Sequence, residues 1–171
     1  MNEPNWLDRD EARAWRGYVA MSEMLEARLS QDLRKVGLSS ADYTVLVLLS
    51  EAPGRRLGLS ELGAEAQWSK SRVSHQIRRM QERGLVVRAD DADDPRRAHA
   101  ILTDAGVAAL RAAAPVHVNG VRRYLLDHLT PQQQACLVDI ALSVLPHLSP
   151  APLPPDLRAD SRPEAPPGAA G

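Results

Sequence analysis

The chain has 171 residues, 44% hydrophobic and 25% charged, with a formal net charge of −1. This is the composition of a soluble globular protein of about one domain, and no apolar run approaches the roughly 20 residues needed to cross a bilayer. A single cysteine excludes an internal disulfide framework, and the polar, acidic first residues are unlike a secretory signal, so we expect a cytoplasmic protein.

The net charge conceals a basic central segment. Residues 55–100 carry 10 Lys or Arg and 7 Asp or Glu, whereas residues 1–54 carry 6 and 9. A local excess of cations in a mildly acidic chain favours a nucleic-acid partner that the overall charge does not indicate.

Two helices are predicted before this segment. Apolar residues recur every three or four positions from Asp8 to Val36, which predicts one long helix that stops at Gly37. A second, short and very apolar helix is predicted over 41–50, with Ser40 as its N-cap.

The basic segment begins with a predicted helix-turn-helix. Ser60 is a natural N-cap for a short helix over 61–66, and Ser69 for a second helix that continues to Arg83 and ends at Gly84. Two short helices joined by a three- or four-residue turn form this unit.

The two sides of the second of these helices differ sharply. At about 100° per residue, Val73, Ile77 and Met80 cluster in a narrow arc that we expect to face inward. The N-cap, the first turn and the opposite side carry cations, hydroxyl groups and an imidazole, which can reach phosphates and base edges in the major groove. These candidate DNA-binding residues are Ser69, Lys70, Ser71, Arg72, Ser74, His75, Arg78 and Arg79. For any single arginine among them, a solvated charged face is the alternative.

A β-hairpin is predicted next, from two β-prone runs over 85–88 and 98–102. Arg96 and Arg97, near its tip, are further candidates for DNA binding in a narrow minor groove, and Asp94 is expected to orient Arg96 by pairing with it. A metal loop is the rival interpretation of the aspartates, but the glycine and terminal glutamate of an EF-hand are missing, so no metal site is expected.

The last part of the chain predicts two more helices and a tail. Thr103 begins a long helix that Pro115 is expected to kink, and Pro131 begins a final apolar helix. The proline-rich residues 149–171 predict disorder. The long first and last helices carry more apolar surface than one small domain needs, which predicts a homodimer; packing within one chain is the alternative.

Two motifs in register resemble signatures of the MarR (multiple antibiotic resistance regulator) family, and the likeness extends over residues 10–148. The recognition-helix motif is Ser69-Lys70-Ser71-Arg72-Val73-Ser74 through Glu82-Arg83-Gly84-Leu85-Val86, and the wing motif is Asp94-Pro95-Arg96 followed by Leu102-Thr103 and Gly106. The segment Tyr43-Thr44-Val45-Leu46 is also similar to the family's second helix.

The resemblance implies a mainly α, winged helix-turn-helix fold with long N- and C-terminal dimerisation helices and a two-stranded β wing. The implied regions are an N-terminal dimerisation region (1–37), a DNA-binding lobe (38–103), C-terminal dimerisation helices (104–148) and the tail (149–171). It further implies a homodimer that binds a pseudo-palindromic operator in double-stranded DNA, usually as a repressor released by a small ligand or by oxidation.

The effector of such a regulator is harder to predict. Ligand pockets of the family lie between the dimer helices and the DNA-binding lobe, which suggests six residues whose alternative role is ordinary core packing: Trp15, Tyr18, Met21, Tyr43, His117 and Arg122. Cys136, on the last predicted helix, is interpreted as a small buried residue and not as a redox sensor.

Other function classes find little support. The sequence has no glycine-rich phosphate loop, nucleophile elbow or zinc-protease histidine pair, so neither an enzyme nor a cofactor is expected. The main alternative is a winged helix that contacts only proteins. Cations on the exposed helix face favour DNA, and we count Lys70, Arg72, Arg78, Arg79 and Arg83 among them.

Overall fold

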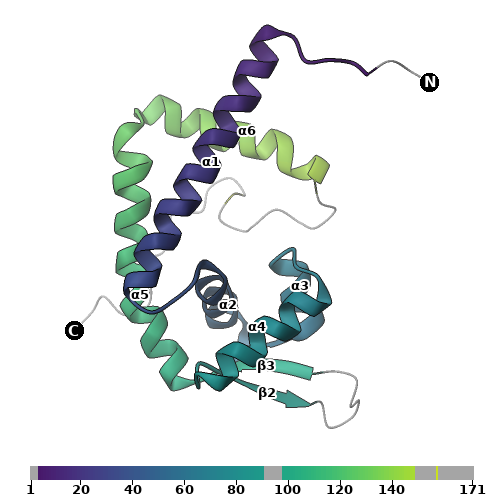
Figure 1. The fold of residues 1–171 in the computed structure, drawn as a ribbon, viewed down its shortest axis with the longest axis vertical. Coiled ribbons are helices and arrows are strands. Elements are labelled where there is room, and N and C mark those ends of the chain that lie inside the picture. The colour runs from purple at the N-terminus through teal and green to yellow at the C-terminus, as the bar shows by residue number, and fades with distance from the viewer. Residues whose placement is uncertain (1–3, 91–97, 149–156, 158–171) are drawn as a thin grey trace. The chain divides into compact units, whose positions relative to one another are not determined.

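The computed structural model describes residues 4–90, 98–148 and 157 (Figure 1). These residues form a mainly helical fold with a small antiparallel sheet, which confirms the predicted fold class, and the chain divides into two compact units, Met1–Leu125 and Leu126–Gly171. No helix in the described part of the chain has both the length and the apolar character that a membrane span requires.

The first helices begin at reciprocal caps. Helix α1 (Arg9–Lys35) starts after Asp8, as predicted, and its last turn is followed by Gly37 at φ +79°. Helix α2 (Ser40–Glu51) is capped by Ser39 and not by Ser40, so that prediction was wrong by one residue. The reason is Asp42, whose carboxylate accepts the N–H of Ser39 at 2.9 Å while its own N–H donates to the Ser39 hydroxyl.

A short connection leads from α2 into the helix-turn-helix. It contains the 3-10 turn η1 (Pro53–Arg55) and strand β1 (Arg56–Gly58), and helix α3 (Leu59–Glu65) follows directly. The N-cap of α3 is Gly58 and not the predicted Ser60, because the Glu61 carboxylate accepts the N–H of Gly58 at 2.9 Å. Ser60 therefore lies inside the first turn of α3.

Helix α4 (Lys70–Glu82) follows the prediction at both ends. Its N-cap is Ser69, and Gly84, at φ +70°, ends it in the left-handed conformation that glycine tolerates best. Val73, Ile77 and Met80 are at most 1% exposed and join a core that includes Leu46 and Val86, so the predicted inward face is confirmed.

The sheet places a hairpin beside α4. Strands β2 (Val86–Asp90) and β3 (Ala98–Leu102) pair antiparallel, as predicted, and β1 adds a third strand on the other side of β3. Strand β1 was not predicted, because three residues are too few to show an alternation of apolar and polar side chains.

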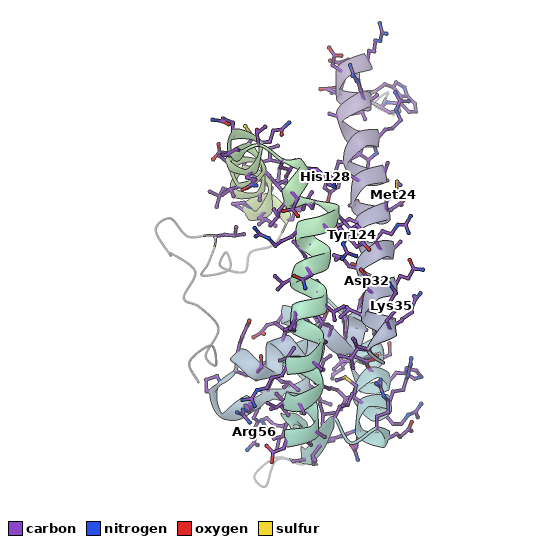
Figure 2. All side chains as sticks on the ribbon, turned by 90° about the vertical axis from the view of Figure 1, so that its left-hand side faces the viewer. Met24, Asp32, Lys35, Arg56, Tyr124 and His128 are labelled. Atoms are coloured by element: carbon purple, nitrogen blue, oxygen red, sulfur yellow. The ribbon has the colours of Figure 1, made fainter. Side chains whose placement is uncertain are left out.

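Helix α5 (Asp104–Tyr124) packs against α1. It begins at Thr103, as predicted, and runs through Pro115 as one continuous helix. Tyr124 donates to Asp32 Oδ2 at 2.9 Å, and Lys35 pairs with Asp32 Oδ1, so the Asp32 carboxylate links the two helices (Figure 2). Hydrogen bonds from Lys35 and then Tyr124 hold the pKa of Asp32 below its ordinary value.

The second unit contains the 3-10 turn η2 (Leu126–His128) and helix α6 (Pro131–Leu148). Gln134 ties the start of α6 to the turn by donating to the Leu126 carbonyl at 3.3 Å. Cys136 is exposed, so its prediction as a buried residue was wrong: residues 131–140 of α6 are all exposed in the single chain.

Candidate nucleic-acid interface

The outer side of α4 is a continuous polar surface. Its core-facing side chains lie on the opposite side, so the remaining positions point to solvent. The exposed cations, hydroxyl groups and imidazole that the sequence singled out are Ser69, Lys70, Ser71, Arg72, Ser74, His75, Arg78 and Arg79. We call this surface the α4 face.

The first turn of α4 carries two cations where the helix dipole is positive. The Ser69 hydroxyl accepts the N–H of Arg72 at 3.3 Å and lies 3.1 Å from the Ser71 hydroxyl. Lys70 and Arg72 place positive charge at this positive end, and each destabilises the free helix by about 0.3–1 kcal/mol. An anion placed at this end reverses that sign, since it attracts both the cations and the helix N–H groups.

An open cleft of about 720 Å³ runs along the α4 face. Its lining comes from α4, from the start of α3 and from β2: Leu59, Ser71, Ser74, His75, Ile77, Arg78, Gln81, Glu82 and Arg88. Sequence reasoning missed Arg88. Its place in the cleft depends on the packing of β2 against α4, which the sequence does not show.

Arg83 was predicted among the cations of the exposed helix face. Its side chain is 40% exposed, but its guanidinium is bound within the protein, so it does not belong to the α4 face. Its guanidinium donates to Asp42 Oδ2 at 2.8 Å and to the Gly37 carbonyl at 2.6 Å. Gln76 donates to the other oxygen of Asp42 at 2.7 Å. The sequence could not reveal this, because the partners are 34 to 46 residues apart.

The tip of the hairpin, with Asp94, Arg96 and Arg97, lies outside the described residues. The strands that lead to it are described, and β2 packs against α4 (Figure 1). The roles of these three residues therefore stay predictions.

Two of the six candidate ligand residues meet between α2 and α5. The rings of Tyr43 and His117 lie 4.6 Å apart, and His117 Nδ1 is buried without a hydrogen-bond partner. Burial lowers the pKa of His117 and outweighs the opposing effect of Glu26. Burial, with the charge of Glu51, raises the pKa of Tyr43.

The other candidates lie elsewhere. The rings of Trp15 and Tyr18 are 5.9 Å apart on α1, and both side chains are more than half exposed. Met21 is 44% exposed, so none of these three is core of a single chain. Along α1, Trp15 precedes Glu26 by 11 residues, or about 16 Å, which separates it from the His117 ring. Arg122 is exposed on α5.

The part of the chain that the structure describes contains no candidate metal site. No three His, Cys, Asp or Glu side chains come together there in a way that would hold an ion.

Comparison with known proteins places these features in context. The MarR family profile matches residues 36–97. The transcriptional regulator HosA of Escherichia coli O157:H7 is 29% identical over 109 residues, which cover 63% of this chain and 78% of HosA.

Two solved structures are similar over most of their length. AbsC, a MarR family transcriptional regulator from Streptomyces coelicolor, is 39% identical with a TM-score of 0.80, over 85% of this chain and 98% of AbsC. Sco3205, a MarR family transcriptional regulator from the same organism that was crystallised in complex with DNA, is 40% identical with a TM-score of 0.82, over 88% of this chain and 95% of Sco3205.

Proposed function

Because the chain belongs to the MarR family of transcriptional regulators, we propose that it binds double-stranded DNA sequence-specifically, as a homodimeric repressor on a pseudo-palindromic operator. The observation that carries the proposal is the α4 face, which presents cations and hydroxyl groups beside a cleft that Arg88 also lines. The complex of Sco3205 with DNA supports it. As a regulator of transcription, the protein acts in the cytoplasm, where the DNA is.

The residues of the α4 face divide by chemistry. Lys70, Arg78 and Arg79 suit phosphates, whereas Ser71, Ser74 and His75 are short enough to read base edges in the major groove. Arg96, oriented by Asp94, enters the minor groove, and Arg97 lies close by. A module that contacts only proteins would instead present apolar or acidic side chains on this face.

The dimer forms through the first and last helices. Large apolar side chains are exposed on α1, among them Trp15, Tyr18 and Met24, and on α6, among them Ile140 and Val144. Leaving this much apolar surface in water is unfavourable, and a second copy of the chain covers it. Residues 1–37 and 104–148 thus serve dimerisation and 38–103 serve DNA binding. The predicted tail, 149–171, lies outside the described residues apart from residue 157.

A small effector releases the dimer from DNA. The Tyr43–His117 pair supports an effector site between α2 and α5, because a buried imidazole nitrogen without a partner gains a hydrogen bond from a ligand. Among compounds that dissociate the wild-type complex, those bound at this site should lose that effect in a His117→Phe variant that still binds DNA.

The experiment that tests DNA binding is selection from a randomised duplex library with the full-length chain. We expect an inverted repeat whose half-sites are about one helical turn, ~10 bp, apart. Failure of the library to yield any consensus would contradict the proposal.

The dimer is tested by sedimentation equilibrium. We expect Ile140→Lys, which places a charge at a 60% exposed apolar position, to shift the protein towards monomer. The matched control is Gln132→Lys, a polar exposed position on the same helix, which should leave the wild-type dimer intact.

A further inference from the structure

Trp68 is held rigidly in the turn that precedes α4. Its backbone N–H donates to the Gly63 carbonyl at 2.8 Å, and its side chain is partly buried against the core. A Cβ on Gly63 would lie 3.2 Å from the Trp68 carbonyl oxygen, so the backbone of this turn is tightly packed. The indole ring is therefore held in place at the edge of the α4 face.

The Arg72 side chain stacks on the Trp68 ring. Its guanidinium carbon is 4.3 Å from the centre of the Trp68 ring, well within the range of a cation–π contact. The spacing of four residues places both side chains on the same side of the helix start. A cation–ring contact on α5, between Arg123 and Tyr124, is longer, at 5.9 Å.

A stacked guanidinium differs from a solvated one in what it can recognise. The ring covers one face of the planar group and leaves its N–H edges free to form a fork of parallel hydrogen bonds. Because the side chain is ordered before binding, less conformational entropy is lost when DNA arrives. Residues at the N-terminal end of a recognition helix are the ones that meet base edges, and the commonest specific contact is arginine with guanine O6 and N7.

We propose that Arg72 reads a guanine in each half-site and that Trp68 is the positioning residue that aims it. The inference rests on the proposed DNA-binding function. Arg72 is thereby a specificity-determining residue, and Trp68 acts on specificity without touching DNA.

The test starts from the duplex consensus selected with the wild-type chain. Binding is measured by fluorescence anisotropy on that duplex, on duplexes with each G·C pair changed to A·T, and on a scrambled duplex. Arg72→Ala and Arg72→Lys should both reduce discrimination at one G·C pair, roughly ten-fold or more, because lysine keeps the charge but lacks the fork. Trp68→Leu should reduce it by about two- to five-fold, and Trp68→Phe, which keeps an aromatic face, should restore most of it.

Two controls separate positioning from folding and from charge. Arg111→Lys changes an exposed arginine on α5, outside the α4 face, and should leave discrimination at that base pair unchanged. Affinity for the scrambled duplex should be nearly unchanged in Arg72→Lys and Trp68→Leu, since their net charge is that of the wild type. Circular dichroism checks that Trp68→Leu folds. If it does not, Trp68→Phe, Arg72→Lys and the double variant test whether the ring positions Arg72. Any loss of guanine discrimination caused by Trp68→Phe must then disappear when Arg72 is already lysine.

Three results would overturn the inference. Unchanged guanine preference in both Arg72 variants means that Arg72 is not a reader. A uniform loss on all duplexes in Arg72→Ala, with a smaller salt dependence, means that it contacts phosphate. Full discrimination in a folded Trp68→Leu variant means that the ring does not position it. If the wild-type chain itself selects no consensus, the proposed function fails first and the inference falls with it.

Discussion

Arg83, at the end of α4, forms an ion pair with Asp42, which lies 41 positions earlier in the chain; the guanidinium and the carboxylate are 2.8 Å apart. The same carboxylate holds Gln76, in the middle of α4. One buried side chain of α2 therefore fixes the middle and the end of the helix that presents the α4 face. The orientation of α4 therefore depends on the Arg83–Asp42 ion pair.

Arg83→Met should therefore destabilise the fold. It keeps the aliphatic length but leaves the buried Asp42 carboxylate without its cation. We expect the free energy of unfolding in urea at pH 7 to fall by about 1–2 kcal/mol, less than for a fully buried pair because the Arg83 side chain is 40% exposed. The dependence of DNA affinity on salt should stay that of the wild type, because Arg83 faces Asp42.

Arg78→Met, in the same helix, should leave stability unchanged but alter the salt dependence of DNA affinity. Arg78 lines the cleft on the α4 face, so its loss should leave the free energy of unfolding within about 0.5 kcal/mol of wild type. The slope of log affinity against log salt should become shallower by about 1. An equally shallow slope in Arg83→Met would show that Arg83 contacts phosphate after all.

The Asp42 carboxylate also predicts a pH dependence. Burial alone would raise the pKa of Asp42, but hydrogen bonds from Ser39 and Arg83 outweigh it and hold the pKa below its ordinary 3.8. A carboxyl group of this kind stabilises the fold above its unfolded-state pKa and loses that contribution as pH falls through the folded-state value. The difference in unfolding free energy between wild type and Asp42→Asn should be constant near neutrality and shrink below about pH 3.8. Urea unfolding at a series of pH values measures it, and a gap that stays constant as pH falls below 3.8 contradicts the assignment.

Gly106 predicts a steric effect where the hairpin meets α5. A Cβ there would lie 2.2 Å from the Leu85 carbonyl oxygen and 2.7 Å from Leu102 Cδ1, closer than packed atoms allow. Gly106→Ala should lower the free energy of unfolding by about 1–3 kcal/mol. Gly17→Ala is its matched control in α1, where nothing lies within 4 Å of the new methyl group; it should raise stability by up to about 1 kcal/mol. Thermal unfolding of both variants decides, and equal signs would refute the steric argument.

Local signals explain what could be predicted from the sequence. The limits of α4 follow from a serine cap and a left-handed glycine, and its inward face follows from the spacing of Val73, Ile77 and Met80. These signals involve residues within a few positions of one another. The N-caps of α2 and α3 were misplaced by one or two residues, because each prediction took a serine inside the first turn for the cap. The acidic residue three positions after the true cap, Asp42 or Glu61, decides the position.

Long-range pairings explain what could not be predicted. Arg83 is chemically equivalent to its neighbours on α4 until Asp42 is brought beside it by the packing of α2. Arg88 joined the cleft only once β2 was seen to pack against α4. Cys136 looked buried from its apolar neighbours, but in the single chain that part of α6 is exposed.

His117 predicts a second pH dependence, in which stability again declines as pH falls, but over a higher pH range than for Asp42. Burial against Tyr43 lowers its pKa below 6.5, although Glu26 opposes the shift. The unfolded chain therefore takes up a proton near pH 6.5 that the folded chain accepts only at lower pH, so stability declines as pH falls below about 6.5 and levels off below the folded-state pKa. In His117→Gln this decline should be smaller, and the stability of the variant relative to wild type should rise between pH 7 and pH 5. Thermal unfolding across that range measures it, and parallel curves for the two proteins would mean that the imidazole titrates alike in both states.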